Sequence, residues 1–477
     1  MISGYVFWLI LSKITTTDII GFSSTVISLA TIFSIVASID VSIGVQRFLG
    51  KNFSEQKLED AKVIVKAALL LMSIGIAVCS ILILAAYNWF YDNFKIDFNL
   101  ILLTILFIGC HGIMTLFRSI IIASLKTKAL PIIVIISAIA KLVLTVILVS
   151  VGTGVLGLTF SFTFFYILAS LLLSITIIMI FKPSSMYKSE VSLRKSFKHI
   201  FRASVASWIP HIILIIGTNL GTLSVFGSHG ASDAGVYFIA FSLVLAISVS
   251  MSALFSIALP TLSGMQDGRK RFAWRIIKIN LISLLPLSFA LMFYSKQIMQ
   301  LFGEDYIKGS SSLEILLLSM LPFTIMTGIT TLIYSYGNYK QFLAIGLATN
   351  IPRAILYILF VPFYDSTGAA ISYTIGAIIG LIASIVVAKK IGMQVFWKDI
   401  ALIAVIPAGS AFLLSYFEVN YLIGIFLTLV VSYLLLLRMH IITRTDVQDL
   451  FAILPYGISY PILNVWKMLC KRVNKIK

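Results

Sequence analysis

The sequence predicts an all-helical integral membrane protein with many spans. Of its 477 residues, 60% are hydrophobic and only 11% are charged. Soluble globular domains carry roughly 45–50% apolar and about 25% charged residues, so this chain has more apolar side chain than a water-facing surface can hold. The mean hydropathy of +1.06 agrees with this reading. These values exclude a soluble fold.

Thirteen apolar segments are long enough, or nearly so, to cross a bilayer. A hydrocarbon core of about 30 Å requires about 20 helical residues. In chain order the segments are 19–45, 63–88, 98–124, 130–151, 154–181, 203–226, 235–262, 276–300, 313–334, 341–363, 367–388, 400–417 and 419–437. Residues 2–12 would reach only about halfway across at ~1.5 Å per residue. We therefore predict nominally fourteen spans with the first truncated: either an upstream extension completes it, or residues 2–12 form a half-inserted helix.

The distribution of basic residues predicts the orientation of these spans. Loops after even-numbered spans hold twenty Lys and Arg, whereas loops after odd-numbered spans hold four, counting Lys296 at the outer end of the ninth span. Because cytoplasmic loops retain Lys and Arg, we expect a multi-pass protein of the cell membrane with both termini in the cytoplasm. The net charge of +18 is split among short loops and therefore does not indicate a nucleic-acid partner.

The C-terminal residues 438–477 are predicted to form a basic cytoplasmic tail. From Ile458 onward, apolar residues including Ile462, Trp466 and Leu469 recur at helical spacing, with basic residues largely elsewhere. This pattern favours an amphipathic helix on the inner leaflet, in contact with anionic membrane lipids, over a frayed tail.

An internal repeat relates two halves of the chain. When residues 124–154 are aligned with residues 335–368, Lys141 lies over Arg353, and TDIIGF at the start of the second span resembles SDAGVY near the start of the eighth. Duplicated halves are typical of membrane transporters, so the repeat predicts two pseudo-symmetric six-helix lobes followed by two C-terminal helices. The predicted domains are an N-lobe at 1–181, a basic cytoplasmic linker at 182–202, a C-lobe at 203–388, two spans at 400–437 and the tail at 438–477.

Three cations lie deep inside predicted spans. Lys141 and Arg353 fall near the middle of repeat-equivalent spans, and Arg118 lies six residues from the inner end of the fourth span. A cation at mid-bilayer costs about 2.5–3.5 kcal/mol on insertion scales unless a wet cavity or a counter-charge compensates it. One deep carboxylate, Asp40, cannot neutralise all three. We therefore predict a cationic cavity between the lobes that binds a phosphate or pyrophosphate; in the alternative, Arg118 snorkels and the other two bond carbonyls beside helix kinks.

Four polar residues are candidates for substrate contact or ion coupling. Asp40 either serves this role or forms a salt bridge with Arg47 or Lys66. His111 and His211 either carry a coupling proton or are interior histidines whose ring nitrogens are hydrogen-bonded within the protein. Asn350 together with Pro352 predicts a broken helix whose freed carbonyls line the cavity.

No catalytic residue, cofactor or metal site is predicted. The three cysteines, Cys79, Cys110 and Cys470, are odd in number and scattered, so they form neither a disulfide framework nor a metal cluster. A GxGxxG pattern at residues 152–157 lies in a turn between two spans, with no preceding soluble strand, and a P-loop is absent. Direct ATP-driven transport by this chain is therefore not expected.

A diffuse pattern of motifs extends over essentially the whole chain. It consists of a polar turn followed by Gly21-Phe22, the pair Arg47-Phe48 at the end of the second span, and a tail containing TRTDVQDLFAILP. This pattern resembles the polysaccharide transporter family of the MOP flippase superfamily, the Wzx-type lipid-linked oligosaccharide flippases. The resemblance implies a MATE/MOP-like fold and alternating-access movement of a polyprenyl-phosphate- or pyrophosphate-linked oligosaccharide from the cytoplasmic to the external leaflet. The truncated first span departs from the family.

Two other function classes remain open. A MATE-like multidrug or organic-cation antiporter would need cavity carboxylates, whereas the deep charges here are mostly cationic. A membrane glycosyltransferase would use acidic pairs, and Glu304-Asp305 is the one adjacent pair in the predicted external loops. We expect a flippase rather than an enzyme, coupled to H⁺ or Na⁺ and partnered by polysaccharide-assembly enzymes.

Overall fold

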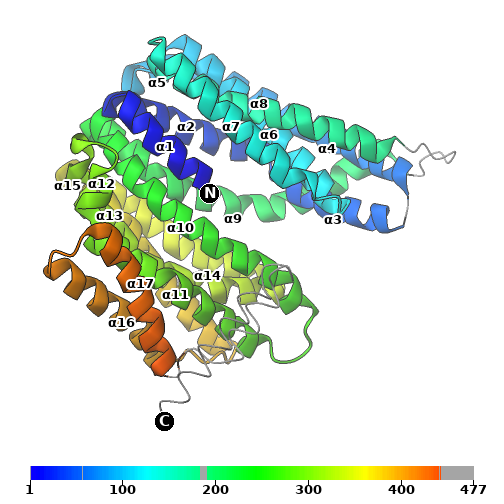
Figure 1. The fold of residues 1–477 in the computed structure, drawn as a ribbon. Helices are drawn as coiled ribbons and strands as arrows, with labels where there is room; N and C mark the ends of the chain where they lie inside the picture. Colours follow the sequence, from blue (N-terminus) through cyan, green and yellow to red (C-terminus); the bar gives the residue numbers. More distant parts are fainter. Residues whose placement is uncertain (1, 56, 183–190, 440, 442–477) are drawn as a thin grey trace. The chain divides into compact units, whose positions relative to one another are not determined.

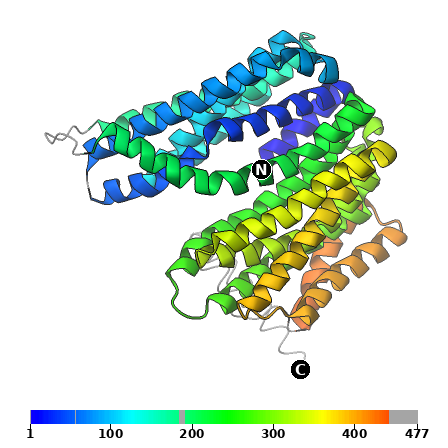
Figure 2. The same cartoon turned by 180° about the vertical axis from the view of Figure 1, so that it is seen from behind.

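Every regular element in the described part of the chain is a helix. The structure, a computed structural model, describes residues 2–55, 57–182, 191–439 and 441. Its helices form two compact units. The first unit comprises the described residues within 2–239 and 354–369, and the second comprises those within 240–353 and 370–441. Figures 1 and 2 show the helices from opposite sides.

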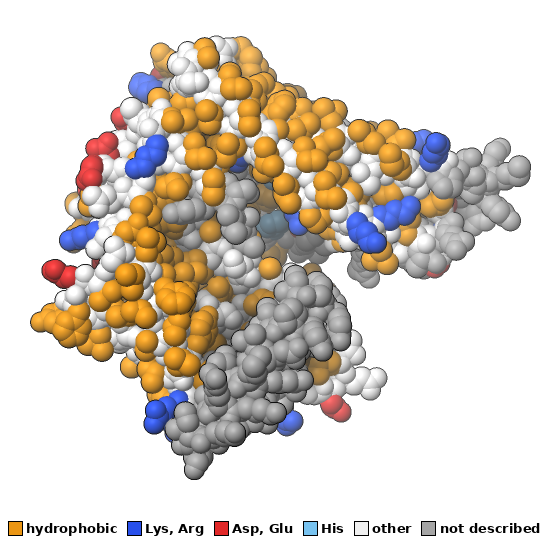
Figure 3. All heavy atoms as spheres, viewed as in Figure 1, with side chains coloured by type: hydrophobic (Ala, Val, Ile, Leu, Met, Phe, Trp, Pro, Cys, Tyr) orange, Lys and Arg blue, Asp and Glu red, His pale blue; other side chains and the backbone are white. Residues whose placement is uncertain are grey.

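The first unit is built around long antiparallel helices. Its elements are α1 (Ile2–Ile14), α2 (Thr17–Ser38), α3 (Val41–Ser54), α4 (Leu58–Ala85), α5 (Tyr87–Phe94), α6 (Phe98–Ala123), α7 (Ala129–Ser150), α8 (Gly154–Phe181) and α9 (Leu193–His229). On α7, exposed apolar side chains recur every three or four residues, at Ile132, Ile135, Ile139, Val143 and Ile147. Such a stripe on a membrane helix faces lipid. Figure 3 shows that apolar side chains also cover much of the outer surface in that view.

The second unit holds most of α10 and the remaining helices. Its elements are α10 (Ala231–Gly264), α11 (Arg269–Phe293), α12 (Ser295–Gln300), the 3₁₀ helix η1 (Glu304–Gly309), α13 (Ser310–Leu318), α14 (Met320–Ser335), α15 (Tyr339–Lys390), α16 (Trp397–Tyr416) and α17 (Tyr421–Arg438). The first turns of α10 and the middle of α15 belong to the first unit. The core of the second unit is apolar and centres on α11, whose residues Ile277 and Leu281 are fully buried.

Twelve helical segments of the described chain are long and apolar enough to cross a membrane, which makes this a multi-pass membrane protein. One of them, α15, has 52 residues with non-helical backbone at Tyr364 and Asp365. At about 1.5 Å per residue it would be more than twice as long as a bilayer core is thick, so it corresponds to the two predicted spans 341–363 and 367–388. The 13-residue α1 is too short to span, and the total of fourteen stays a prediction.

The predicted span 19–45 was wrong as a single helix. The helix α2 ends at Ser38, and Ile39 and Asp40 both adopt positive φ, at 48° and 49°, before α3 begins. Positive φ is unusual for a β-branched residue and interrupts the helical hydrogen bonds. The indole nitrogen of Trp208 donates a 2.9 Å hydrogen bond to the Ile35 carbonyl, which satisfies one of the freed acceptors at the end of α2. Hydropathy is continuous through this break, so the sequence pattern concealed it.

The repeat-equivalent starts of α2 and α10 contact each other. Gly21 and Gly235 pack backbone against backbone: a Cβ on Gly21 would lie 1.7 Å from the Ala231 carbonyl oxygen. Four residues earlier on α2, the hydroxyl of Thr17 is 3.0 Å from that of Ser232. Only glycine permits this approach, because any side chain would collide with the opposite backbone. The similarity of TDIIGF and SDAGVY therefore has a direct structural counterpart.

Two predicted segments fall partly or wholly outside the described residues. The linker prediction covers residues 182–202, of which residues from Leu193 onward form the start of α9. The amphipathic helix predicted within the tail lies outside the described residues. The domain boundaries stay a prediction.

Candidate functional site

Arg353 lies inside a continuous helix, which corrects the predicted break at Asn350 and Pro352. The only non-helical residues within α15 are Tyr364 and Asp365, eleven and twelve positions further on. Proline lacks an N–H, but transmembrane helices tolerate it where neighbouring groups satisfy the freed carbonyl or the helix adjusts locally. The Asn350 side chain donates to the Gly346 carbonyl at 2.9 Å rather than opening the helix.

The Arg353 guanidinium is enclosed by the second unit, with 1% of the residue exposed. Its Nη1 donates to Asn350 Oδ1 at 3.2 Å, and its Nη2 donates to the Tyr373 carbonyl at 3.4 Å. The guanidinium carbon also lies 4.0 Å from the centre of the Tyr373 ring, a cation–π geometry. The buried Nε–H has no hydrogen-bond partner. One nitrogen of a buried cation is therefore left to donate to another ligand.

Gly376 makes room for this guanidinium. A Cβ at Gly376 would lie 2.8 Å from the Cβ of Arg353 and 2.9 Å from its Nε. Real Cβ atoms almost never approach another heavy atom this closely. Residue 376 must therefore be glycine for Arg353 to keep its position. The repeat alignment that places Gly154 over Gly368 also places Phe162 over Gly376.

Lys141 of α7 is enclosed by aromatic rings of the first unit. Its Nζ lies 4.0 Å from the ring centres of Phe7 and Phe162, and 5.8 Å from that of Phe165. Phe7 belongs to α1, so this short helix contributes directly to the site. Aromatic rings attract cations through their quadrupoles, by about 2 kcal/mol where water is excluded.

Neither of these repeat-equivalent cations is ion-paired with a carboxylate in the described part of the chain. Phe162 contacts Lys141 and Gly376 contacts Arg353, so corresponding positions on the following helical segment contact the cation in both halves. Arg118 differs: its side chain on α6 is exposed and makes no hydrogen bond or ion pair with described residues. An exposed Arg118 can either snorkel to the inner interface or contact a substrate near it.

Asp40 occupies the break between α2 and α3 and is 3% exposed. Its Oδ1 lies 3.5 Å from Nδ1 of His211 and accepts a 3.4 Å hydrogen bond from the hydroxyl of Ser42. Its buried Oδ2 has no partner. The structure therefore pairs Asp40 with a histidine, whereas the sequence analysis had offered only a lysine or an arginine.

The second predicted histidine lies close to this pair. The Ser34 hydroxyl is 2.6 Å from Nδ1 of His111, and the imidazole stacks on Phe107 and meets the edge of Tyr166. The two imidazoles are near enough to interact electrostatically. Residues from α2, α6, α9 and the Asp40 break thus form one polar cluster within the apolar first unit.

Sequence reasoning missed Ser34 and Trp208 as parts of this cluster. A signal for Ser34 was available, since α2 carries small polar residues along one side, including Ser24, Ser28 and Ser38. Polar residues recurring at helical spacing in a span indicate a face turned away from lipid. Nothing in the sequence connected Trp208 with the Ile35 carbonyl. No group of His, Cys, Asp and Glu among the described residues is arranged to hold a metal ion.

One known protein family matches more than half of this sequence. Residues 25–310 match a family described as polysaccharide biosynthesis protein. None of the curated proteins matches the sequence.

Three solved structures illustrate the fold. The lipid II flippase MurJ in an inward closed conformation is 17% identical, with a TM-score of 0.64 over 89% of this chain and 97% of that one. An inward-facing multidrug resistance MATE transporter of the MOP superfamily is 14% identical, with a TM-score of 0.58 over 81% and 97%. A MOP superfamily transporter from Pyrococcus furiosus, described as having a binding pocket of reversed polarity, is 14% identical, with a TM-score of 0.55 over 82% and 90%. The predicted MOP-type all-helical fold is confirmed.

Proposed function

The chain belongs to the polysaccharide biosynthesis protein family, and from that premise we propose that it is a flippase. Its substrate is an oligosaccharide linked to a polyprenyl phosphate or pyrophosphate, which moves from the cytoplasmic to the external leaflet of the cell membrane by alternating access. The protein performs no catalysis. The enzymes that assemble the polysaccharide are its partners, and both termini lie in the cytoplasm.

The observation that carries this proposal is the pair of repeat-equivalent cations. Lys141 and Arg353 are enclosed in membrane helices without a carboxylate partner in the described chain. Aromatic rings offset only part of the cost of such a charge. A phosphate offsets the remainder, because arginine donates to it in a fixed geometry and lysine attracts it as a point charge.

Binding requires these cations to become accessible during the transport cycle. Arg353 is 1% exposed here, with Tyr373 against one face of its guanidinium. The unpaired Nε is the donor that a phosphate would occupy after the Tyr373 ring moves aside. A ligand that binds one conformation better shifts the population toward it, so a phosphate that binds the open state would itself favour this movement. Arg118 belongs to the proposed path nearer the inner surface.

The polar cluster of the first unit is the proposed coupling site. Asp40 has one unpaired oxygen and faces His211, so it can take up H⁺ or Na⁺. His111 and its serine partner extend the cluster. We expect Asp40→Asn to remove the dependence of transport on the ion gradient, and proteoliposome assays with imposed H⁺ or Na⁺ gradients would measure this. An unchanged gradient dependence would eliminate Asp40 from coupling.

The direct test of function is leaflet-resolved measurement of the lipid-linked glycan in a deletion strain. We expect full-length lipid-linked oligosaccharide to accumulate where an impermeant glycan-modifying reagent cannot reach it. Normal export together with increased sensitivity to cationic drugs would instead favour the antiporter. Release of free lipid carrier by the purified protein would favour a glycosyltransferase, with Glu304 and Asp305 as the first residues to test.

A further inference from the structure

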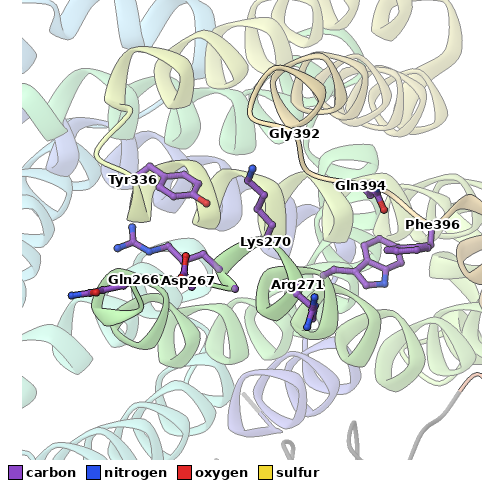
Figure 4. A pocket seen from close by; sticks show the side chains of 11 residues that line it. Gln266, Asp267, Lys270, Arg271, Tyr336, Gly392, Gln394 and Phe396 are labelled. Carbon is purple, nitrogen blue, oxygen red and sulfur yellow. The ribbon is translucent and has the colours of Figure 1, made fainter.

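A basic pocket lies where three connections of the second unit converge, as Figure 4 shows. Its volume is about 520 Å³. The lining residues come from the α10–α11 connection, the start of α11, the connection after α14 and the α15–α16 connection: Gln266, Asp267, Gly268, Arg269, Lys270, Arg271, Trp274, Tyr336, Gly392, Gln394 and Phe396. The positive-inside distribution of charge assigns all three connections to the cytoplasmic side. The pocket is therefore expected at the level of the inner leaflet headgroups.

Arg269 lines this pocket, and its guanidinium already forms hydrogen bonds within the protein. Its guanidinium donates to the backbone carbonyls of Met265, Ser263 and Ser335. It also lies 5.3 Å from the centre of the Tyr336 ring. This residue therefore ties the end of α14 to the α10–α11 connection, and a substitution there would disturb the fold.

Lys270 and Arg271 are different, because both are exposed and neither forms a hydrogen bond or ion pair within the described chain. In Figure 4 the Lys270 amine points toward the turn at Gly392, where a Cβ would lie 3.3 Å from its Nζ. The lining contains one carboxylate, Asp267, against three cations. These cations also occupy the first turn of α11, which has no acidic residue and no side-chain cap. Positive charge at a helix N-terminus is unfavourable, and an anion would relieve it.

One wall of the pocket is aromatic. Trp274 and Phe396 lie with ring centres 5.3 Å apart, and Phe396 is 48% exposed. The neighbouring Trp397 is 53% exposed. Aromatic side chains gather at the level of lipid headgroups because they contact apolar and polar surroundings together. The pocket thus joins cationic donors to an apolar edge, a combination suited to an amphipathic ligand.

We propose that this pocket binds the phosphate of an anionic phospholipid from the cytoplasmic leaflet, with Lys270 and Arg271 on the phosphate and Phe396 beside the glycerol and upper acyl chain. The recognised chemistry is a phosphate ester, and the apolar edge selects the lipid over a free phosphate. This inference rests on the predicted orientation of the spans and is independent of the flippase proposal.

Native mass spectrometry of the full-length protein tests this proposal. The purified protein is titrated with phosphatidylglycerol and with phosphatidylcholine of identical acyl chains. We expect tighter binding of phosphatidylglycerol, and a loss of this preference by about tenfold in Lys270→Gln/Arg271→Gln, because charge-assisted hydrogen bonds disappear. Asp267→Asn removes the opposing carboxylate and should strengthen the preference, a gain that misfolding cannot produce.

The matched control is Lys126→Gln/Lys128→Gln, which removes two exposed cations from a connection of the first unit that is also predicted to be cytoplasmic. It should retain the preference of the unmodified protein. An equal loss in this control, or an unchanged preference in Lys270→Gln/Arg271→Gln, would overturn the proposal. Complete displacement of phosphatidylglycerol by millimolar glycerol 3-phosphate or inorganic phosphate would also overturn it and assign the pocket to free phosphate.

Discussion

The surroundings of Lys141 and Arg353 differ although the repeat places both cations at the same position. Arg353 has two hydrogen-bond acceptors, one aromatic ring and a glycine beside it. Lys141 has two rings at 4.0 Å and a third further away. A planar guanidinium with several donors needs directional acceptors and space, whereas an ammonium is a compact charge that rings can surround. The repeat thus preserves the charge while each half supplies the surroundings that suit its own cation.

We expect the largest effect from Arg353→Ala. Loss of the guanidinium removes the donor proposed for the substrate phosphate and leaves a cavity beside Tyr373, so flipping should fall by at least about tenfold, the equivalent of one strong charge-assisted hydrogen bond. Arg353→Lys should recover little, because an ammonium cannot reproduce the planar contacts. Leaflet-resolved glycan export at matched protein level measures both. Normal export by Arg353→Ala would refute a substrate role.

Lys141→Met separates a transport role from a structural one. Methionine retains the apolar stem and removes the charge, and apolar replacement of a buried charge is often neutral or stabilising. We therefore expect an unchanged or higher melting temperature together with export reduced by about tenfold, the loss of one charge-assisted contact. If export and stability both stayed normal, the aromatic enclosure of Lys141 would have only a packing role.

Gly376→Leu tests whether Arg353 depends on the space beside it. The added side chain would displace the guanidinium, and overpacking of this kind typically costs about 1–3 kcal/mol. Thermal unfolding in detergent measures the change. Gly346→Ala on the same helix is the control, since nothing lies within 4 Å of its Cβ position; it should be neutral or stabilising by up to about 1 kcal/mol. Equal melting temperatures for both variants would contradict the predicted crowding.

Phe162→Leu should have the smallest effect. It preserves most apolar volume but removes one of the two rings at 4.0 Å from the lysine amine, a loss of about 0.5–2 kcal/mol. In the double variant with Lys141→Met this cost should vanish, because no cation remains to interact with the ring. A double-variant cycle of melting temperatures measures the coupling. Additive effects would show that Phe162 contributes packing alone.

Several features of this protein follow from its composition and residue pattern, and both can be read from the sequence alone. Apolar runs of span length identify a membrane protein, because apolar side chains are stable in the hydrocarbon core whichever residues they pack against. The repeat and the cations within spans are likewise readable along the chain, so Lys141 and Arg353 could be identified as a pair. The similarity of the segments around Gly21 and Gly235 could also be read from the repeat, whereas their contact could not.

Only the tertiary structure decided which groups meet. The apolar run 19–45 continues through Ile39 and Asp40, yet the helix breaks there. The other helix continues through Pro352, where a break was expected. At the first position a neighbouring helix stabilises the break, because Trp208 donates to a carbonyl freed there. At the second position the Asn350 side chain bonds within its own helix. His211 beside Asp40 and Phe7 beside Lys141 come from helices distant in sequence. Such contacts depend on packing in three dimensions, which no local pattern encodes.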